Sequence, residues 1–218
     1  MSRLEPLAPP YPEDVSKTFA KLMPPGMPPL ALFRVVARNP RVLRRMQRGG
    51  LLDPGSIPLR LRELTILRTT ARCGAGYELA VHAAFFGGAA GFTREDIEAA
   101  ARGAVSDPRW SAQERLALAL ADALHDEGDV GDTLHAELAR AFSPAQHVEL
   151  VMLVGLYHAV SFLCRAFRLP PEAGTEALAQ LAEAPTERGP RITTPASTVA
   201  PTVAAHIPVD SDSKGDSP

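Results

Sequence analysis

A glutamate and a histidine four residues apart are the clearest candidates for chemistry in this sequence. Glu78 and His82 lie in the segment YELAVHAAFFGGAAGF, where a helix would place both side chains on one face. His82 is the only ionisable residue between Leu79 and Phe92, so such a helix would have no solvated face and should be buried all round. Its polar groups must then pair with each other, another residue, water or a ligand.

A buried histidine–carboxylate pair can act as a general acid–base catalyst. Burial raises the pKa of a carboxyl group and lowers that of a histidine, while pairing has the opposite effect on each. This competition can hold one group near neutral pH, as proton transfer requires. The alternative is a core histidine that Glu78 holds without any catalytic role. We expect no metal at this pair, because the sequence has no HExxH motif and no Cys/His cluster with zinc spacing.

A second carboxylate, Glu63, interrupts the apolar stripe of the preceding segment, IPLRLRELTILRTTARC. On a helical wheel it shares one side with Leu59, Ile66, Leu67 and Thr70. Burying a lone carboxylate is costly unless it is paired or protonated. Glu63 is therefore either a further functional group or the partner of Arg60 or Arg62 at the margin of the stripe.

The elements that must position these side chains are predicted to be helices throughout. Strand-like alternation is almost absent, and Ala, Leu, Arg and Glu dominate the middle of the chain. Thr93, Ser111 and Ser143 each precede an acidic or amide residue at the third helical position, a pattern typical of a capping box. We predict helices at 30–37, 40–48, 58–73, 77–90, 94–102, 112–127, 132–141 and 144–167, with weaker ones at 14–23 and 171–183.

Composition divides the chain into three segments. Residues 1–29 are proline-rich, residues 30–184 form the predicted helical domain, and residues 185–218 are rich in Pro, Thr, Ser and Ala without a helical period. We expect the last segment to be disordered. The predicted fold is all-α, a compact multi-helix bundle with a disordered C-terminal tail.

The overall composition excludes several classes of function. With 23 Lys plus Arg against 25 Asp plus Glu, and only 6% aromatic residues, we expect no nucleic-acid partner. The longest apolar run, Leu150–Cys164, is shorter than the ~20 residues that span a bilayer, so we expect no membrane association. The N-terminus lacks the apolar stretch of a signal peptide and cysteines are few, which favours a cytoplasmic location.

Four stretches occur in an order that is similar to one known superfamily. They are ALFRVVARNPRVLRRM, then LRLRELTILR with fifteen residues from Glu63 to Glu78 and four more to His82, then Trp110 before SAQER, and HVELVMLVGLYH on the last long helix. Together they resemble the carboxymuconolactone decarboxylase and alkyl hydroperoxidase D-like (AhpD-like) superfamily over roughly residues 28–170. The resemblance implies a compact helical domain that assembles into a homo-oligomer, a trimer or hexamer, with its site near a subunit contact.

The redox branch of this superfamily is marked by a glutamate, a CxxC pair and a histidine. In this sequence the glutamate and the histidine fall on Glu63 and His82, but the two thiol positions fall on Ala75 and Glu78. Dithiol–disulfide cycling needs a nucleophilic thiolate and a resolving thiol, and neither is in its place. The resemblance is therefore to the branch without CxxC, and it makes peroxidase activity doubtful.

The non-redox branch, which includes gamma-carboxymuconolactone decarboxylase, has a glutamate four residues before the histidine, as Glu78 and His82 do here. The resemblance implies a cofactor-independent lyase or isomerase acting on a small carbonyl-containing acid or lactone. His82 would be the general acid or base and Glu78 would orient it. Glu63 would relay a proton or contact substrate, and Tyr77 would donate a hydrogen bond to an enolate oxygen.

Two alternative functions remain open. One is a peroxiredoxin- or alkyl hydroperoxidase-like thiol reductase that uses Cys73, and the other is a non-catalytic binding or assembly member of the superfamily. We expect His158 to be a core or interface histidine and Cys164 to be an inert core residue.

Overall fold

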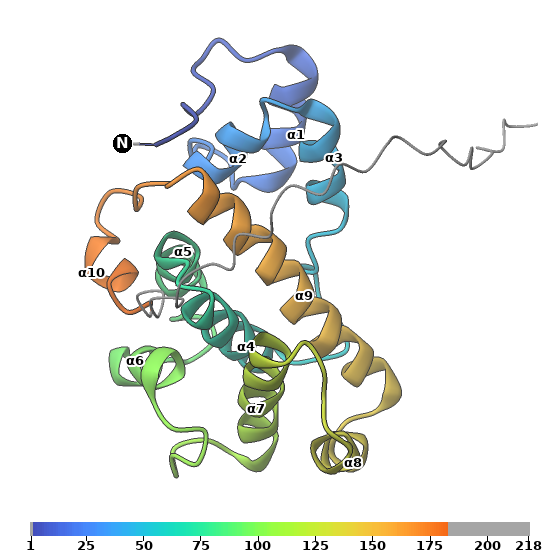
Figure 1. The fold of residues 1–218 in the computed structure, drawn as a ribbon. Helices are drawn as coiled ribbons and strands as arrows, with labels where there is room; N and C mark the ends of the chain where they lie inside the picture. Colours follow the sequence, from blue (N-terminus) through green and yellow to red (C-terminus); the bar gives the residue numbers. More distant parts are fainter. Residues whose placement is uncertain (1, 183–218) are drawn as a thin grey trace, which may run out of the picture. The chain divides into compact units, whose positions relative to one another are not determined.

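The computed structural model describes residues 2–182, and this part of the chain is all-helical, as predicted (Figure 1). Its helices are α1 (Glu13–Leu22), α2 (Ala31–Val36), α3 (Pro40–Arg48), α4 (Leu59–Arg72), α5 (Gly76–Phe86), α6 (Arg94–Arg102), α7 (Ala112–Asp126), α8 (Asp132–Ala141), α9 (Pro144–Ala166) and α10 (Glu176–Ala179). The predicted disordered tail, 185–218, lies outside the described residues.

The predicted capping residues begin their helices. The hydroxyls of Thr93, Ser111 and Ser143 accept hydrogen bonds from backbone amides at the third position of α6, α7 and α9, and each forms a full capping box. These caps satisfy amides that have no partner within the helix, which explains why the starts of these helices follow from sequence.

Helix α4 lies at the centre of the domain and packs against α5, α6, α7 and α9. Eleven consecutive residues, 61–71, are buried although several are polar. The hydroxyls of Thr65, Thr69 and Thr70 donate to carbonyls one turn earlier, and Arg68 forms a bidentate pair with Asp122 of α7. Local partners therefore allow a polar helix to occupy the core.

Two helices are shorter than predicted, and glycines explain both. Helix α5 ends at Phe86 rather than near residue 90, and the following turn closes at Gly91, whose φ is +71°. The predicted helix 171–183 is reduced to α10, because Gly174 with φ +83° ends any helical run before Thr175. The C-terminal turn of α5 is also less buried than predicted, since Phe85 is 44% exposed.

The proline-rich N-terminal segment is part of the helical domain. Val15 and Phe19 of α1 are buried in the same apolar cluster as residues of α2, α3 and α9, together with Tyr77 and Val81 of α5. Leu4, Leu7 and Tyr11 pack against this cluster from outside. Residues 4–22 thus cover one end of α5, next to the candidate site.

Among the described helices, α9 alone has the length and apolarity needed to cross a membrane. Its buried side chains, Leu150, Leu153, Val154, Tyr157, Val160, Ser161 and Cys164, face the domain, and the helix packs against α4, α5, α7 and α8. This packing is typical of the core helix of a folded domain.

Candidate active site

The structure places His82 between three polar side chains in an apolar surround. His82 is 3% exposed, and its Nδ1 lies 2.7 Å from Oε2 of Glu63. Its Nε2 lies 3.0 Å from the hydroxyl of Tyr157 and 3.4 Å from Oε1 of Glu78. Each ring nitrogen of His82 therefore faces oxygen atoms, and the two sides of the ring have different partners.

Glu63 is held from behind by a guanidinium. Arg62 lies beside it, with Nε 2.9 Å from Oε1 of Glu63, and Nη1 of Arg62 donates to the carbonyl of Leu52 at 2.7 Å. Glu63 is fully buried, and one of its oxygens serves Arg62 while the other serves His82. The salt bridge with Arg62 that the sequence left open is thus present, but in the interior and not at a solvated margin.

The other side of the histidine opens onto an apolar cavity of about 230 Å³. Its ionisable or hydroxylated lining groups are Glu78, His82 and Tyr157. The rest of the lining is Leu22, Met23, Pro24, Met27, Leu30, Leu32, Phe33, Met46, Gly50, Leu52, Val81, Phe85, Phe86, Leu156 and Val160. Glu63 is not part of the wall, so His82 separates it from any molecule bound in the cavity.

The surroundings of His82 favour its protonated form. Burial lowers the pKa of the imidazole, but hydrogen bonds to Glu63 and Glu78 and the charges of both carboxylates outweigh this and raise it to about 9. Burial, reinforced by the charges of Glu78 and Glu63, raises the pKa of Tyr157 well above its usual value. At neutral pH the cavity therefore presents an imidazolium and a neutral phenol.

The protonation states fix the direction of the hydrogen bonds. With Nε2 protonated, His82 donates to the oxygen of Tyr157, and the carboxylate of Glu78 is a second acceptor within reach. The hydroxyl proton of Tyr157 is then free to donate to a molecule in the cavity. The arrangement can supply a proton, stabilise a developing oxyanion and accept a proton at Glu78.

The structure brings together three of the four residues singled out from the sequence, and it exchanges the roles of the two carboxylates. Glu63 makes the shorter contact with the imidazole and holds Nδ1, the task expected of Glu78. Glu78 lines the cavity, where the substrate contact expected of Glu63 would be made.

Tyr77 lies elsewhere. Its hydroxyl donates to Glu172 at 2.5 Å and accepts from the backbone amide of Leu32 at 3.1 Å, and it is not part of the cavity wall. The tyrosine that contacts His82 is Tyr157 of α9, a residue that no sequence motif singles out. Its neighbours on that helix are apolar core residues, so its position in the sequence is typical of a residue that packs in the core. The one feature that could have indicated a contact with His82 is the presence of a hydroxyl group in an apolar stripe.

The two cysteines are free and buried, and the pKa of each thiol is raised. Burial raises the pKa of Cys73, against the opposing effects of the nearby Ser161 hydroxyl and of Arg165 and Arg72. Burial and the charge of Glu78 raise that of Cys164 well above its usual value. Sγ of Cys164 lies 3.8 Å from Oε2 of Glu78, behind the cavity wall.

Comparisons with known proteins agree with this architecture. Residues 40–123 match the profile of the carboxymuconolactone decarboxylase family. A peroxidase-related protein from Silicibacter sp. TM1040 superposes with a TM-score of 0.70 at 16% identity, covering 80% of this chain and 94% of its own. The debrominase Bmp8 in its apo form gives 0.69 at 17% identity, covering 83% and 97%.

A protein of unknown function from Agrobacterium tumefaciens, whose name refers to the antioxidant defence protein AhpD, gives a TM-score of 0.58 at 17% identity, covering 63% of this chain and 95% of its own. No curated protein matches the sequence significantly. At these identities the solved structures establish the fold, and the chemistry must be argued from the side chains present here.

Proposed function

The chain belongs to the carboxymuconolactone decarboxylase/AhpD-like superfamily, and on that premise we propose that it is a cofactor-independent acid–base enzyme for a small carbonyl-containing acid or lactone. The family and the debrominase neighbour support an enzymatic role for this fold. The observation that supports the particular chemistry is the chain of contacts from Glu63 through His82 to the cavity.

His82 is the proposed general acid. In a decarboxylation, the bond between the carboxylate and the adjacent carbon breaks, carbon dioxide leaves, and the electron pair is delocalised into a neighbouring carbonyl as an enolate. The Tyr157 hydroxyl donates a hydrogen bond to the enolate oxygen, and the Nε2 proton of His82 passes to carbon. Glu63 remains on Nδ1 and holds the ring in place, and His82 regains its proton from solvent.

Glu78 gives the same site a base. Its carboxylate lies on the cavity wall 3.4 Å from Nε2 of His82, so it can remove a proton next to a carbonyl while His82 returns one at another atom. Isomerisation or lactone opening would use these groups in that order. The small cavity volume, below the ~300 Å³ typical of sites for drug-sized ligands, favours a compact substrate.

The thiol alternative has weaker support in this chain. The cysteine-to-alanine variant of the debrominase named above was crystallised with 2,3,4-tribromopyrrole, so a cavity on this fold can hold a small aromatic molecule. Here, however, Ala75 and Glu78 stand at the thiol positions, and Cys73 is not part of the cavity wall. Its raised pKa also disfavours the thiolate that attacks peroxides.

The proposal is tested by screening β-keto acids and lactones for turnover and for proton–deuterium exchange next to the carbonyl in heavy water, without added thiol or peroxide. We expect turnover in the wild type and a loss of turnover of about 100-fold or more in His82→Gln. The control variant His135→Gln, on the exposed side of α8, should turn over substrate as fast as the wild type. Equal turnover in wild type and His82→Gln, or activity only with peroxide and a thiol, would refute it.

A further inference from the structure

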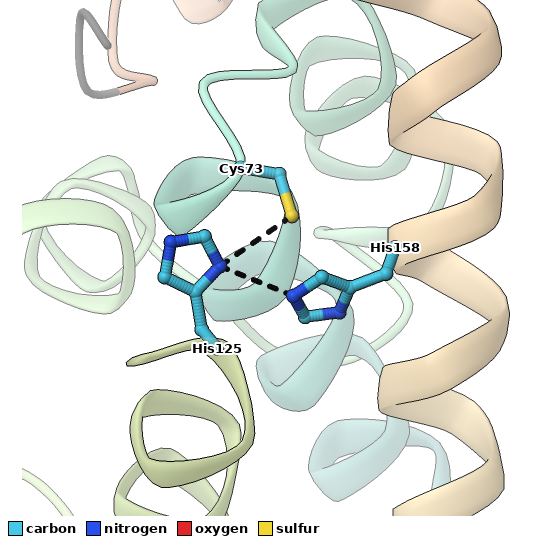
Figure 2. Close-up of side chains that lie close together, drawn as sticks. All are labelled: Cys73, His125 and His158. Carbon is cyan, nitrogen blue, oxygen red and sulfur yellow. Dashed lines mark hydrogen bonds between the residues drawn. The ribbon is translucent and has the colours of Figure 1, made fainter. Parts of the chain in front are cut away.

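Three helices bring a cysteine and two histidines together away from the cavity (Figure 2). Cys73 follows the last residue of α4, His125 lies in the last turn of α7, and His158 lies in the second half of α9. None of the three lines the cavity beside His82. They are 52 and 33 residues apart along the chain, so no sequence motif links them.

Two of the three separations between the side-chain atoms are close to those between metal ligands. Sγ of Cys73 lies 3.7 Å from Nδ1 of His125, which lies 3.1 Å from Nε2 of His158, and all three atoms are within 4.8 Å of one another. Ligands at the corners of a tetrahedron around Zn²⁺ are about 3.3 Å apart for two nitrogens and about 3.6 Å for nitrogen and sulfur. We propose that Cys73, His125 and His158 form a binding site for a thiophilic divalent cation, with Zn²⁺ as its ligand.

The orientation of His158 is already that of a metal ligand. Its Nδ1 lies 2.9 Å from the carbonyl oxygen of Val154, one turn earlier in α9, and donates its proton there. That bond fixes the tautomer and leaves Nε2 with a lone pair directed toward the other two residues. Metal-binding histidines are commonly held in this way by a hydrogen bond from the second ring nitrogen.

Cys73 is held just as firmly by the end of α4. Gly74 adopts a left-handed conformation with φ +64°, and the amides of Gly74 and Ala75 donate to Ala71 and Thr70, which closes the helix in a Schellman motif. Arg165 of α9 donates to the carbonyl of Cys73 at 2.8 Å. The thiol is therefore presented to the histidines by a rigid backbone.

One further polar group lies beside the cluster. The hydroxyl of Ser161, one turn after His158 on α9, is fully buried, and its contact with Cys73 lowers the pKa of that thiol. Three protein ligands leave a fourth tetrahedral position for water, and a hydroxyl beside Cys73 can bond to that water or to the thiolate. Since His125 and His158 are only half-buried, an ion can reach the cluster from solvent.

Binding must displace the thiol proton. A cysteine binds Zn²⁺ as its thiolate and a histidine binds it as the neutral imidazole. Each Zn²⁺ bound should therefore release about one proton, and the apparent affinity should rise about tenfold per pH unit below the pKa of the thiol.

The test is a titration of the full-length, untagged chain, stripped of metal by chelator, with Zn²⁺ by calorimetry and with Co²⁺ by absorption spectroscopy. We expect one equivalent of Zn²⁺ to bind and Co²⁺ to give a thiolate-to-metal charge-transfer band. Cys73→Ser should abolish the band, and both Cys73→Ser and His158→Gln should weaken Zn²⁺ binding by about 100-fold or more. Cys164→Ser and His147→Gln, which alter the other cysteine and a histidine elsewhere on α9, should bind like the wild type.

A second readout covers variants that fold poorly. Zn²⁺ at a hundredfold excess over its Kd should raise the Tm of the wild type by about 5 °C or more and leave that of Cys73→Ser unchanged. The proposal is overturned if Zn²⁺ does not bind, if Cys73→Ser and His158→Gln bind as tightly as the wild type, or if Co²⁺ binds without a thiolate band. Because the cluster lies outside the cavity, none of these results bears on the proton-transfer function.

Discussion

At the scale of single residues, the different roles of Glu63 and Glu78 depend on the other groups that each carboxylate contacts. Glu63 has Arg62 on one oxygen and His82 on the other, so its charge is compensated in the interior. Glu78 faces the cavity and has the thiol of Cys164 as its other neighbour. Spacing predicted that Glu78 would be near His82 and the resemblance implied the same of Glu63, but their roles depend on contacts between helices.

The two tyrosines give a matched pair of variants. Tyr157→Phe removes the hydroxyl that faces the cavity and should reduce turnover about 100-fold while leaving the fold intact. Tyr77→Phe leaves Glu172 and the amide of Leu32 without that partner, so it should cost about 1–3 kcal/mol of stability with turnover near wild type. Steady-state kinetics and urea unfolding of both variants check this. If Tyr77→Phe loses turnover and Tyr157→Phe does not, the catalytic tyrosine is Tyr77.

At the scale of elements, helix starts were predictable and helix partners were not. Thr93, Ser111 and Ser143 act within their own helices, so local sequence determines them. The all-α fold followed from periodicity and the pairing of Glu78 with His82 from their spacing, while the resemblance implied that Glu63 belongs to the same site. The contact of Tyr157 with His82 and the cysteine–histidine cluster could not be predicted, because they depend on how α9 packs against α4, α5 and α7.

Glycine at the start of α5 allows a close approach of α10. A Cβ at Gly76 would lie 2.4 Å from the carbonyl oxygen of Ala179, and that backbone atom cannot move aside as a flexible side chain can. Gly76→Ala should therefore destabilise the protein by about 1–3 kcal/mol. Gly88→Ala, where a Cβ would meet nothing within 4 Å, should be neutral or slightly stabilising. Thermal unfolding of the two variants compares them, and equal Tm values would contradict this packing.

At the scale of the whole molecule, the protonated histidine should make stability depend on pH. The pKa of His82 is raised from 6.5 unfolded to about 9 folded, so between these values the folded state binds more protons. Its stabilising contribution, of order 3 kcal/mol, is fully present below pH 6.5 and is lost as the pH rises through 9. Urea unfolding at pH 6 and pH 9 measures how much free energy of unfolding is lost as the pH rises. This loss should be smaller in His82→Gln than in the wild type, and equal losses would contradict the prediction.

The homo-oligomer implied by the resemblance remains a prediction, and α9 offers a surface for it. Val148, Met152, Gly155, Ala159 and Phe162 form an exposed stripe along this helix, with Met152 58% and Phe162 65% exposed. If the stripe is a subunit contact, Met152→Glu should yield monomers in light scattering, while Val42→Glu on α3 should not. An oligomer unchanged in Met152→Glu would place the contact elsewhere.

The central claim is that Glu63 holds His82 as an imidazolium beside the cavity, and an NMR titration of the His82 ring nitrogens tests it most directly. In the wild type we predict a pKa of about 9, with Nδ1 protonated toward Glu63. In Glu63→Gln the pKa should fall steeply, because burial then acts with less opposition, and in Glu78→Gln it should also fall, since Glu78 supports the charge from the other nitrogen. A wild-type pKa near 6.5 that is unchanged in both variants would contradict the account. His82 would then be a core histidine without a catalytic role.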